Sequence, residues 1–461
     1  MTESEADTRF GRISRRTVLA SLPASALVGG FAGGAIGQSV NGGGTLGARV
    51  EPATTTGSPL SRARSFSDAH SFGIVGDGTT DQAAALNAMI SDVPDGHDVL
   101  LPAGEYVVGS RLRLRSGINL IGSGAGSTTL RLLDEAEPTF VLLSGEAGIR
   151  ISGIAFDGGQ NDLAVSLQVD GCTDIVIEDC TFTRMGHAVH LYSSTTASCS
   201  GITVRNNRFS LIEDFAVRVT EGVSSVLIEN NTVADVSKGE APSPAAFYIR
   251  GVDVTVVGNT VESSADTGVL VAGPETRNVT VVGNRMRTTL VTVFLGSGAS
   301  HGTIVGNTLF SERDFGVHLF DREGGSISTI VSQNHLLSSG KSGVQVEGVS
   351  DFIISSNLIS DPGTRTGQKV QWRCGVTLTS TDGGGAASFV VSGNIILSED
   401  SSSQMNYGIL VTGAAEGAHI VSNVVRGALA EGVRLEQDLR APYYVETDDA
   451  IITSRTVSTR R

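Results

Sequence analysis

Apolar and polar residues alternate in short runs along most of the chain, and the runs return at a regular interval. The hexapeptide VTVVGN occurs at 254–259 and again at 279–284. Most asparagines aligned with its last residue lie 23–29 residues apart: Asn207, Asn231, Asn259, Asn284, Asn307, Asn334, Asn357, Asn394 and Asn423. Cys180 takes this place at the start of the series. An apolar residue precedes each asparagine by three positions and another follows it by two, which predicts one structural unit per interval.

A second marker follows several of these asparagines after about nine residues. It is a small residue that opens an alternating run: AVRVT from 216, GVLVA from 268, GVHLF from 316, GVQVE from 343 and GVRLE from 432. The longest intervals contain insertions between the two markers, near 236–245, 361–373 and 398–406. The repeat survives these insertions, which indicates that loops grow between units of constant design.

The spacing of apolar residues selects among the repeat folds of this period. Alternation with period two excludes helical repeats, which need a period of 3.6. Leucine is not the dominant anchor, so leucine-rich repeats do not fit. We therefore predict an all-β fold, a single-stranded, right-handed parallel β-helix of roughly 10–12 coils. At each corner we expect the asparagine to adopt a left-handed backbone and its amide to hydrogen-bond along the stack.

The segment before the repeats predicts a cap for the open end of this solenoid. Thr79 or Thr80 is expected to cap a helix of about 81–92, with Asp81 at its positive end. Its apolar face consists of Ala84, Leu86, Met89 and Ile90. A helix laid over the first coil covers backbone groups that otherwise remain unpaired. The expected layout is a cap with the first coils at 67–125, repeats at 126–440 and a C-terminal tail or cap at 441–461.

The N-terminus resembles a twin-arginine export signal. Arg15 and Arg16 directly precede an apolar run rich in Ala, Leu and Gly. We expect residues 1–40 to engage the twin-arginine translocation machinery and residues 41–66 to form a flexible linker. The protein is then expected to be periplasmic or extracellular, either released or held at the membrane by this segment.

Charge and cysteine content narrow the function. A net charge of −15 argues against nucleic acid as a partner. The four cysteines lack metal-ligand spacing, and no motif gathers the several oxygens that calcium needs. We expect no cofactor and assign no metal site, with calcium as the alternative that no motif supports.

The stretch 71–124 resembles the opening of a known superfamily. It contains Gly73, Gly76-Asp77-Gly78, Asp81, the expected helix, Leu101-Pro102-Ala103-Gly104 and Tyr106. This series is similar to the pectate-lyase-like β-helix superfamily, of the rhamnogalacturonase and tailspike type. Together with the export signal, the layout also resembles bacterial twin-arginine-translocated repetitive proteins. The resemblance implies a protein that cleaves, epimerises or binds acidic polysaccharides. The signature motifs of polygalacturonases and of alginate epimerases are absent.

Outward-facing positions of the alternating strand form two columns that carry the candidate chemistry. The first reads His190, Arg218, Tyr248, Leu270, Leu295, His318, Gln345, Thr377, Leu410 and Arg434. The second reads Tyr192, Thr220, Arg250, Ala272, Ser297, Phe320, Glu347, Thr379, Thr412 and Glu436.

Three polar side chains stack at one end of the first column. His190, Arg218 and Tyr248 are the candidate catalytic residues, because removal of a C5 proton from a uronate needs a base and a cation. Tyr192, Glu221 and Arg250 lie alongside them as candidate substrate contacts. A solvated polar face with ordinary ion pairs is the alternative reading.

A second group of candidate substrate contacts comprises His318, Asp321, Arg322 and Glu347, with Asp314 before the strand. The sequence thus favours an exported β-helix protein that binds or modifies an acidic polysaccharide, by β-elimination or by hydrolysis. The alternative is a non-catalytic repeat protein for glycan binding or cell-surface attachment.

Overall fold

The computed structural model describes residues 65–133, 139–194, 198–236, 244–264, 266–380, 386–413, 415–436, 439–440 and 444–445. The expected signal at 1–40, almost all of the linker at 41–66 and most of the tail at 441–461 lie outside these ranges. So does the centre of the insertion near 236–245.

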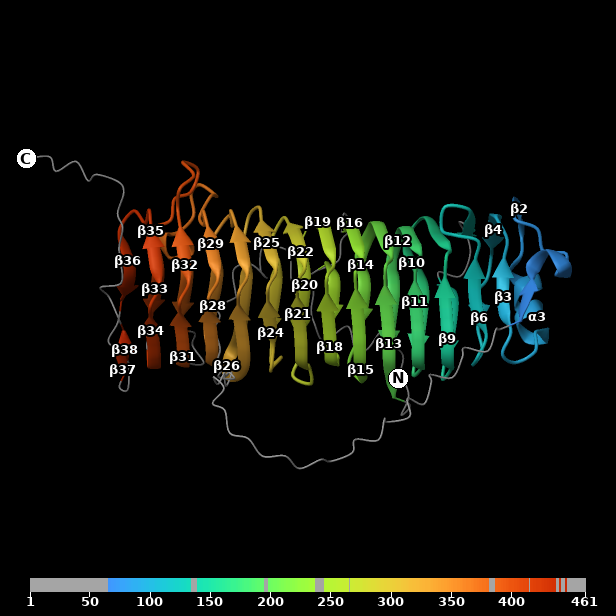
Figure 1. Ribbon diagram of the computed structural model, residues 1–461, viewed down its shortest axis with the longest axis horizontal. Coiled ribbons are helices and arrows are strands. Elements are labelled where there is room, and N and C mark those ends of the chain that lie inside the picture. The colour runs from blue at the N-terminus through green and yellow to red at the C-terminus, as the bar shows by residue number, and fades with distance from the viewer. Residues whose placement is uncertain are drawn as a thin grey trace, which may run out of the picture.

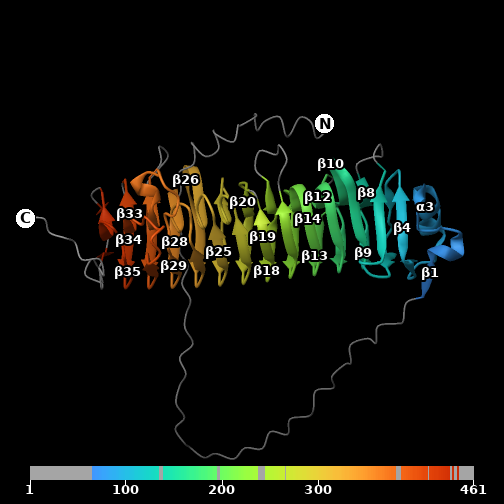
Figure 2. The same cartoon turned by 90° about the horizontal axis from the view of Figure 1, so that it is seen from above.

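The described strands pair in parallel and wind into a solenoid of about 13 turns. Figures 1 and 2 show the coils stacked in one direction, from α3 at one end to β36 at the other. This is the predicted right-handed parallel β-helix. The count slightly exceeds the expected 10–12 coils, because the first coils carry no asparagine marker. Each coil contributes to three sheets, which we call sheets I, II and III.

Sheet I contains the alternating strands after the second marker. Its members are β5 (Leu112–Arg113), β8 (Thr139–Ser144), the ends of β10 (Ala155–Asp170), β12 (Thr181–Tyr192) and β14 (Arg208–Val219), then β17 (Ala245–Ile249), β20 (Thr267–Ala272), β23 (Val293–Gly296), the starts of β26 (Val317–Ser332) and β28 (Val344–Ser355), and β30 (Cys374–Thr379), β33 (Tyr407–Thr412) and β36 (Glu431–Leu435).

Sheet II contains the strands that end before the asparagine. Its members are β1 (Phe66–Asp68), β3 (Asp98–Leu101), β6 (Asn119–Gly122), β9 (Ala147–Ser152), β11 (Thr173–Glu178), β13 (Cys199–Arg205), β15 (Val223–Glu229), β18 (Val252–Val257), β21 (Arg277–Val282), β24 (Thr303–Val305), the ends of β26 and β28, β31 (Ala386–Ser392), β34 (Ala415–Val421), β37 (Leu439–Arg440) and β38 (Tyr444–Val445).

Sheet III contains the strands that follow the asparagine. Its members are β2 (Asp77–Asp81), β4 (Gly104–Val108), β7 (Thr128–Leu132), the starts of β10, β12 and β14, then β16 (Thr232–Val236), β19 (Thr260–Ser264), β22 (Arg285–Thr288), β25 (Thr308–Ser311), β27 (His335–Leu337), β29 (Leu358–Ser360), β32 (Ile395–Leu397) and β35 (Val424–Arg426).

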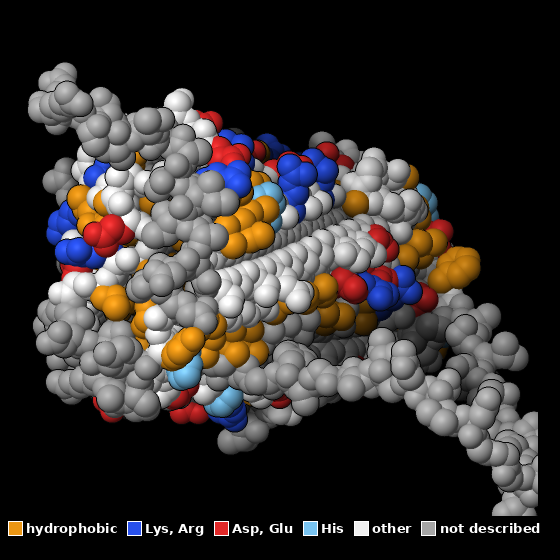
Figure 3. Space-filling model, turned by 60° about the vertical axis from the view of Figure 1, so that its left-hand side comes forward, with side chains coloured by type: hydrophobic (Ala, Val, Ile, Leu, Met, Phe, Trp, Pro, Cys, Tyr) orange, Lys and Arg blue, Asp and Glu red, His pale blue; other side chains and the backbone are white. Residues whose placement is uncertain are grey.

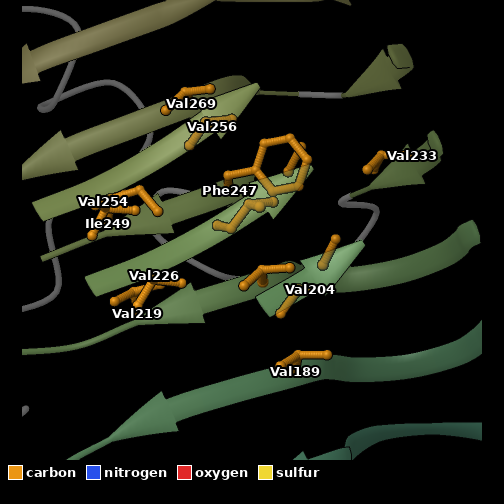
Figure 4. Close-up of a cluster of buried hydrophobic side chains, with 14 of the residues drawn as sticks. Val189, Val204, Val219, Val226, Val233, Phe247, Ile249, Val254, Val256 and Val269 are labelled. Carbon is orange, nitrogen blue, oxygen red and sulfur yellow. The ribbon is translucent and has the colours of Figure 1, made fainter. Parts of the chain in front are cut away.

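The core is a column of apolar side chains that the three sheets enclose. Figure 4 shows Val204, Val226 and Val254 together with Phe247 in this interior. Phenylalanines also stack between coils, with the rings of Phe182 and Phe209 5.0 Å apart and nearly parallel. Equivalent residues of successive coils meet because parallel strands lie about 4.8 Å apart, so a strict sequence repeat produces a continuous core.

The aligned asparagines form a buried hydrogen-bonded ladder, as the repeat predicts. The backbone N–H and the side-chain Nδ2 of Asn259 both donate to Oδ1 of Asn284, at 2.9 and 3.0 Å. The same pattern runs from Asn207 to Asn423. At the start of the series the N–H of Cys180 donates to Asn207.

The prediction that the asparagine itself adopts the left-handed conformation is wrong. The preceding residue does so: φ is 65° at Gly258, 63° at Gly283 and 55° at Gln333. The reason is that the ladder amide must point into the corner, and a left-handed residue just before it turns the chain.

The capping helix α3 (Ala83–Asp92) covers the first coil, and the short helix η1 (Ala69–Phe72) precedes it. Its buried face is Ala83, Leu86, Met89 and Ile90, so Ala83 replaces the expected Ala84. Neither Thr79 nor Thr80 caps it. The Asp81 carboxylate accepts from the N–H groups of Ala83 and Gly109 instead, at 3.0 and 2.9 Å. No helix in the described part of the chain has the length and apolarity to span a bilayer.

Two glycines of the opening segment have a geometric role. A side chain at Gly76 would lie 2.8 Å from the backbone of Gly104. The first coils therefore approach each other at a point where only glycine fits.

Candidate functional site

The first outward column lies in register on sheet I. His190 pairs with Arg218, and Arg218 pairs with Tyr248, on three successive coils. The column continues through Leu270, Phe294, His318, Gln345, Thr377, Leu410 and Arg434.

One coil departs from the expected register. Phe294 and Gly296 take the outward places assigned to Leu295 and Ser297, and Leu295 is buried. The bend after Asn284 is one residue shorter than its neighbours, and a shift of one residue exchanges the two faces of a strand.

His190, Arg218 and Tyr248 form the first cluster together with Tyr192. The rings of His190 and Tyr192 lie 5.0 Å apart, and Gln168 donates a 2.8 Å hydrogen bond to the Tyr192 hydroxyl. The Arg218 guanidinium carbon lies 5.9 Å from the Tyr248 ring centre. Among the described residues, Arg218 has no carboxylate partner. The cluster therefore offers a partly buried cation whose charge no carboxylate of the described residues neutralises.

The expected contacts Glu221 and Arg250 pair with each other at the edge of this cluster. Glu221, which flanks Arg218 in the sequence, is thus engaged by Arg250. Arg250 and Glu221 therefore form a charged rim beside the first cluster.

Burial keeps His190 neutral. Only 7% of this residue is exposed. Burial, followed by the nearby charges of Arg218 and His187, lowers the pKa of His190 to about 3. Its Nε2 atom is buried without a hydrogen-bond partner among the described residues. A group with such a low pKa is a weak general base near neutral pH. Its burial suits His190 to hydrogen bonding better than to proton removal, and its catalytic role stays a prediction.

Sequence reasoning missed a second histidine in this place. His187 Nε2 lies 3.3 Å from Oδ2 of Asp214, and the His187 ring lies 5.8 Å from that of His190. His187 occupies the outward position that pairs with Phe215 on the next coil. A carboxylate that orients an imidazole is the usual arrangement for proton transfer. The sequence pattern carried no signal for His187, because residues three apart lie on opposite faces of a regular strand. Here Ala188 and Val189 are both buried next to a register shift, so both histidines face outward.

The second group is a buried polar cluster rather than an exposed face. His318 and Glu347 are 2% and 4% exposed. Their neighbours are Gln345, which donates to Glu347, and Lys341, which lies 2.9 Å from Asp314. We call these five residues the second cluster. Lys341 and Gln345 were not among the predicted contacts, although Gln345 belongs to the first column.

Protonation in the second cluster is shifted in two directions. Burial, with a smaller effect of Lys341, lowers the pKa of His318 to about 3. Burial raises the pKa of Glu347 to about 8, against the opposing effects of Gln345 and Lys341. At neutral pH the imidazole and the carboxyl group are therefore both uncharged.

Asp321 and Arg322 follow His318 on the same strand. They lie in β26 where its register shifts, between Phe320 and Gly325, as the strand leaves sheet I for sheet II. Arg322 is exposed. Their place in one site with His318 stays a prediction, since the chain bends directly after Phe320.

The insertion at 361–373 lies beside the second cluster. It contains the short helix η2 (Val370–Trp372). The Gln371 carbonyl accepts a 3.0 Å hydrogen bond from Thr377 of the first column. The Gly363 N–H donates to the carbonyl of Lys341 at 2.8 Å. This insertion is thus a fixed wall at the edge of sheet I.

The surface of the molecule also has a hollow that carries few charged side chains. Figure 3 shows a long hollow floored mainly by backbone and uncharged side chains, with charged side chains along its edges. Within the described residues, no three His, Cys, Asp or Glu side chains form a potential metal site.

Two family models match the chain. One is described as rhamnogalacturonase A/epimerase, pectate lyase-like, and matches residues 66–293. The other, right handed beta helix region, matches residues 245–425. Together they extend from the cap to the last asparagines of the ladder.

Curated relatives match shorter segments. Mannuronan C5-epimerase AlgE2 of Azotobacter vinelandii is 33% identical over 115 residues, which is 22% of this chain and 11% of that protein. Mannuronan C5-epimerase AlgE4 of the same organism is 37% identical over 75 residues, 14% of each chain. The matched segments thus span little more than a tenth of these relatives.

Solved structures share the whole fold at low identity. The A-module of the A. vinelandii epimerase AlgE4 has a TM-score of 0.56 and 18% identity, covering 83% of this chain and 100% of that one. Tailspike protein 3 of bacteriophage CBA120 has a TM-score of 0.56 and 13% identity, covering 84% and 61%. The coil geometry and the two family matches agree: this chain is a right-handed parallel β-helix, and its residues 66–293 are similar to the pectate-lyase-like family.

Proposed function

We propose that this protein binds an acidic polysaccharide on the outer face of sheet I, with the first cluster as the main contact. The observation that carries the proposal is Arg218, a cation without a carboxylate partner among the described residues. A guanidinium binds a sugar carboxylate through two parallel hydrogen bonds. Tyr192 and Tyr248 add aromatic surface, and His190 adds an unpaired nitrogen.

The sequence relatives support a uronate as the ligand. The matched proteins are named mannuronan C5-epimerases, so the polymer in their names is built of uronate sugars. Because this chain matches only a small part of them, their activity is a hypothesis for it.

Proton abstraction is the better supported chemistry if the bound glycan is modified. His187 with Asp214 provides the base, and Arg218 stabilises the negative charge that develops when a C5 proton leaves. β-Elimination results if the C4–O bond then breaks, the electron pair forms the C4–C5 double bond and the leaving glycan oxygen takes a proton from solvent. Epimerisation results if C5 regains a proton on its other face. Hydrolysis needs two carboxyl groups placed about 5–9.5 Å apart across the bond, and here Asp214 lies against His187 and Glu221 pairs with Arg250.

Binding without turnover is the second candidate. The observation that favours it is the neutral, buried state of His190, since a group held with a pKa of about 3 serves recognition better than proton transfer. Such a protein would attach to a glycan surface and leave it intact.

Calorimetric titration with oligomers of mannuronate, galacturonate and glucuronate tests the proposal. We expect saturable binding of at least one, and about a tenfold loss of affinity in Arg218→Ala. Arg285→Ala, which removes an exposed arginine of sheet III, should bind like the wild type. The absence of binding to every uronate oligomer, or equal binding by Arg218→Ala, would contradict the proposal.

The products distinguish the chemistries. Absorbance from unsaturated ends indicates β-elimination, new reducing ends without it indicate hydrolysis, and an altered sugar configuration by NMR indicates epimerisation. His187→Gln should abolish product formation and reduce affinity by less than about threefold if His187 is the base.

A further inference from the structure

The insertion at 361–373 has a composition unlike that of the rest of the chain. Its sequence, DPGTRTGQKVQWR, contains three basic residues and one acidic residue, whereas the whole protein has 33 basic and 48 acidic residues. It also contains Trp372, the only tryptophan. A basic segment with a single tryptophan on an acidic protein suggests recognition of an anionic ligand.

Lys341 of the second cluster contacts the Trp372 ring. The Lys341 ammonium lies 4.5 Å from the Trp372 ring centre and 4.7 Å from that of Phe315. Lys341 is 7% exposed and paired with Asp314. This buried cation fixes the indole, because a desolvated cation–π contact is stronger than an exposed one.

An accessible cation lies at the same ring. The Lys369 ammonium is 5.1 Å from the Trp372 ring centre, and Lys369 is exposed. No carboxylate within the described residues pairs with Lys369. Trp372 is half-buried, so part of its ring reaches solvent.

The wall that carries these residues is anchored on both sides. The insertion near 398–406 supports it through two contacts. Ser403 donates to the Pro362 carbonyl at 2.7 Å, and Gln404 accepts from Arg373 at 2.8 Å. Toward sheet I, the Gln371 carbonyl accepts from Thr377. The tryptophan and the lysine thus lie at the edge of the outward column, three strands beyond Phe294.

We propose that Trp372 and Lys369 form a second subsite for the acidic glycan, separate from the first cluster. The indole stacks on the apolar face of a sugar ring, and the lysine ammonium contacts its carboxylate. This inference rests on the proposed function of sheet I. It adds a contact surface that comes from the insertion and not from a strand of sheet I.

The single tryptophan allows this subsite to be observed directly. Fluorescence of the full chain is titrated with a uronate oligomer and with a neutral glucose oligomer of equal length. We expect a saturable change with the acidic oligomer only. Lys369→Ala and Trp372→Ala should each weaken affinity by calorimetry about fivefold or more. Arg208→Ala, an exposed arginine of sheet III, is the matched control.

A variant of the first cluster distinguishes the new subsite from the proposed function of sheet I. Arg218→Ala should weaken overall affinity while a fluorescence change persists at higher ligand concentration. If the wild type binds by calorimetry but Lys369→Ala and Trp372→Ala bind equally well, the subsite is refuted and the proposed function stands. If no acidic oligomer binds, both are refuted.

Discussion

At the scale of single residues, the asparagine ladder shows how one side chain satisfies several buried backbone groups. Each amide accepts from the coil before it and donates to a carbonyl of that coil. The asparagine must be buried to do this, and Asn284 is 1% exposed. The conformational demand falls on its predecessor, which is glycine, asparagine, serine or glutamine. Two neighbouring positions thus divide two tasks, hydrogen bonding and turning.

Replacement of Asn284 by alanine should destabilise the protein by about 3 kcal/mol, because it leaves the Asn259 N–H and the Val256 carbonyl without their partners. Urea unfolding measures the change. Gly283→Asn serves as the control, since a side chain there meets no atom within 4 Å and asparagine tolerates a positive φ. Equal stability of Asn284→Ala and wild type would show that the ladder contributes nothing.

Glu347 should make stability depend on pH in the alkaline direction. Its pKa is about 8 in the folded protein and near 4.5 in the unfolded chain. Between these values the folded state holds a proton that the unfolded state has lost, so the free energy of unfolding falls as pH rises. Glu347→Gln removes this titration. At pH 8 it should be more stable than wild type by on the order of 3–5 kcal/mol.

The test for Glu347 is chemical denaturation of both proteins between pH 6.5 and 8. The low pKa of His318 affects stability only below about 6.5, where the unfolded chain gains a proton. The two effects therefore separate. Parallel stability curves for wild type and Glu347→Gln across this range would contradict the assigned protonation.

At the scale of elements, the cap and the insertions decide how the coils end and what borders them. Helix α3 closes the first coil with Leu86, Met89 and Ile90. Its N-terminus depends on Asp81, which also holds Gly109 of a later coil. The same carboxylate therefore starts the helix and ties it to the solenoid. The insertion at 361–373 borders sheet I at β30 and carries Trp372, the only tryptophan of the sequence.

Asp81→Ala should destabilise the protein by about 1–2 kcal/mol, because two backbone N–H groups lose their acceptor. Thr79→Ala should change stability by less than about 0.5 kcal/mol, since Thr79 is exposed and does not cap the helix. Thermal unfolding of both variants gives the comparison. A larger loss of stability in Thr79→Ala than in Asp81→Ala would indicate that Thr79 caps the helix.

At the scale of the whole molecule, the solenoid brings residues that are far apart in the sequence to within a few strands of one another on one sheet. Arg218 on β14 and Thr377 on β30 lie far apart in the chain but six strand pairings apart on sheet I. This corresponds to about 29 Å. The column between them is largely apolar and aromatic, with Leu270 and Phe294.

If one glycan contacts both the first cluster and Trp372, affinity should rise with chain length until the oligomer spans about 29 Å. Calorimetry with a graded series of uronate oligomers measures this dependence. In Lys369→Ala the gain beyond the shortest binding oligomer should shrink. Full affinity for the shortest oligomers would show that the two contacts do not serve one chain.

The sequence by itself determined the coil, the ladder and the register of most of the outward column. This was possible because residues at equivalent positions of the repeat lie next to one another on stacked coils. His190, Arg218 and Tyr248 were therefore predictable as neighbours. The sequence did not predict that these side chains are buried or partly buried. Only the tertiary structure placed His187 against Asp214, paired Glu221 with Arg250 and buried the second cluster. These contacts depend on side-chain packing between coils and on insertions that follow no repeat. For the same reason, only the structure placed Trp372 against Lys341 and Lys369.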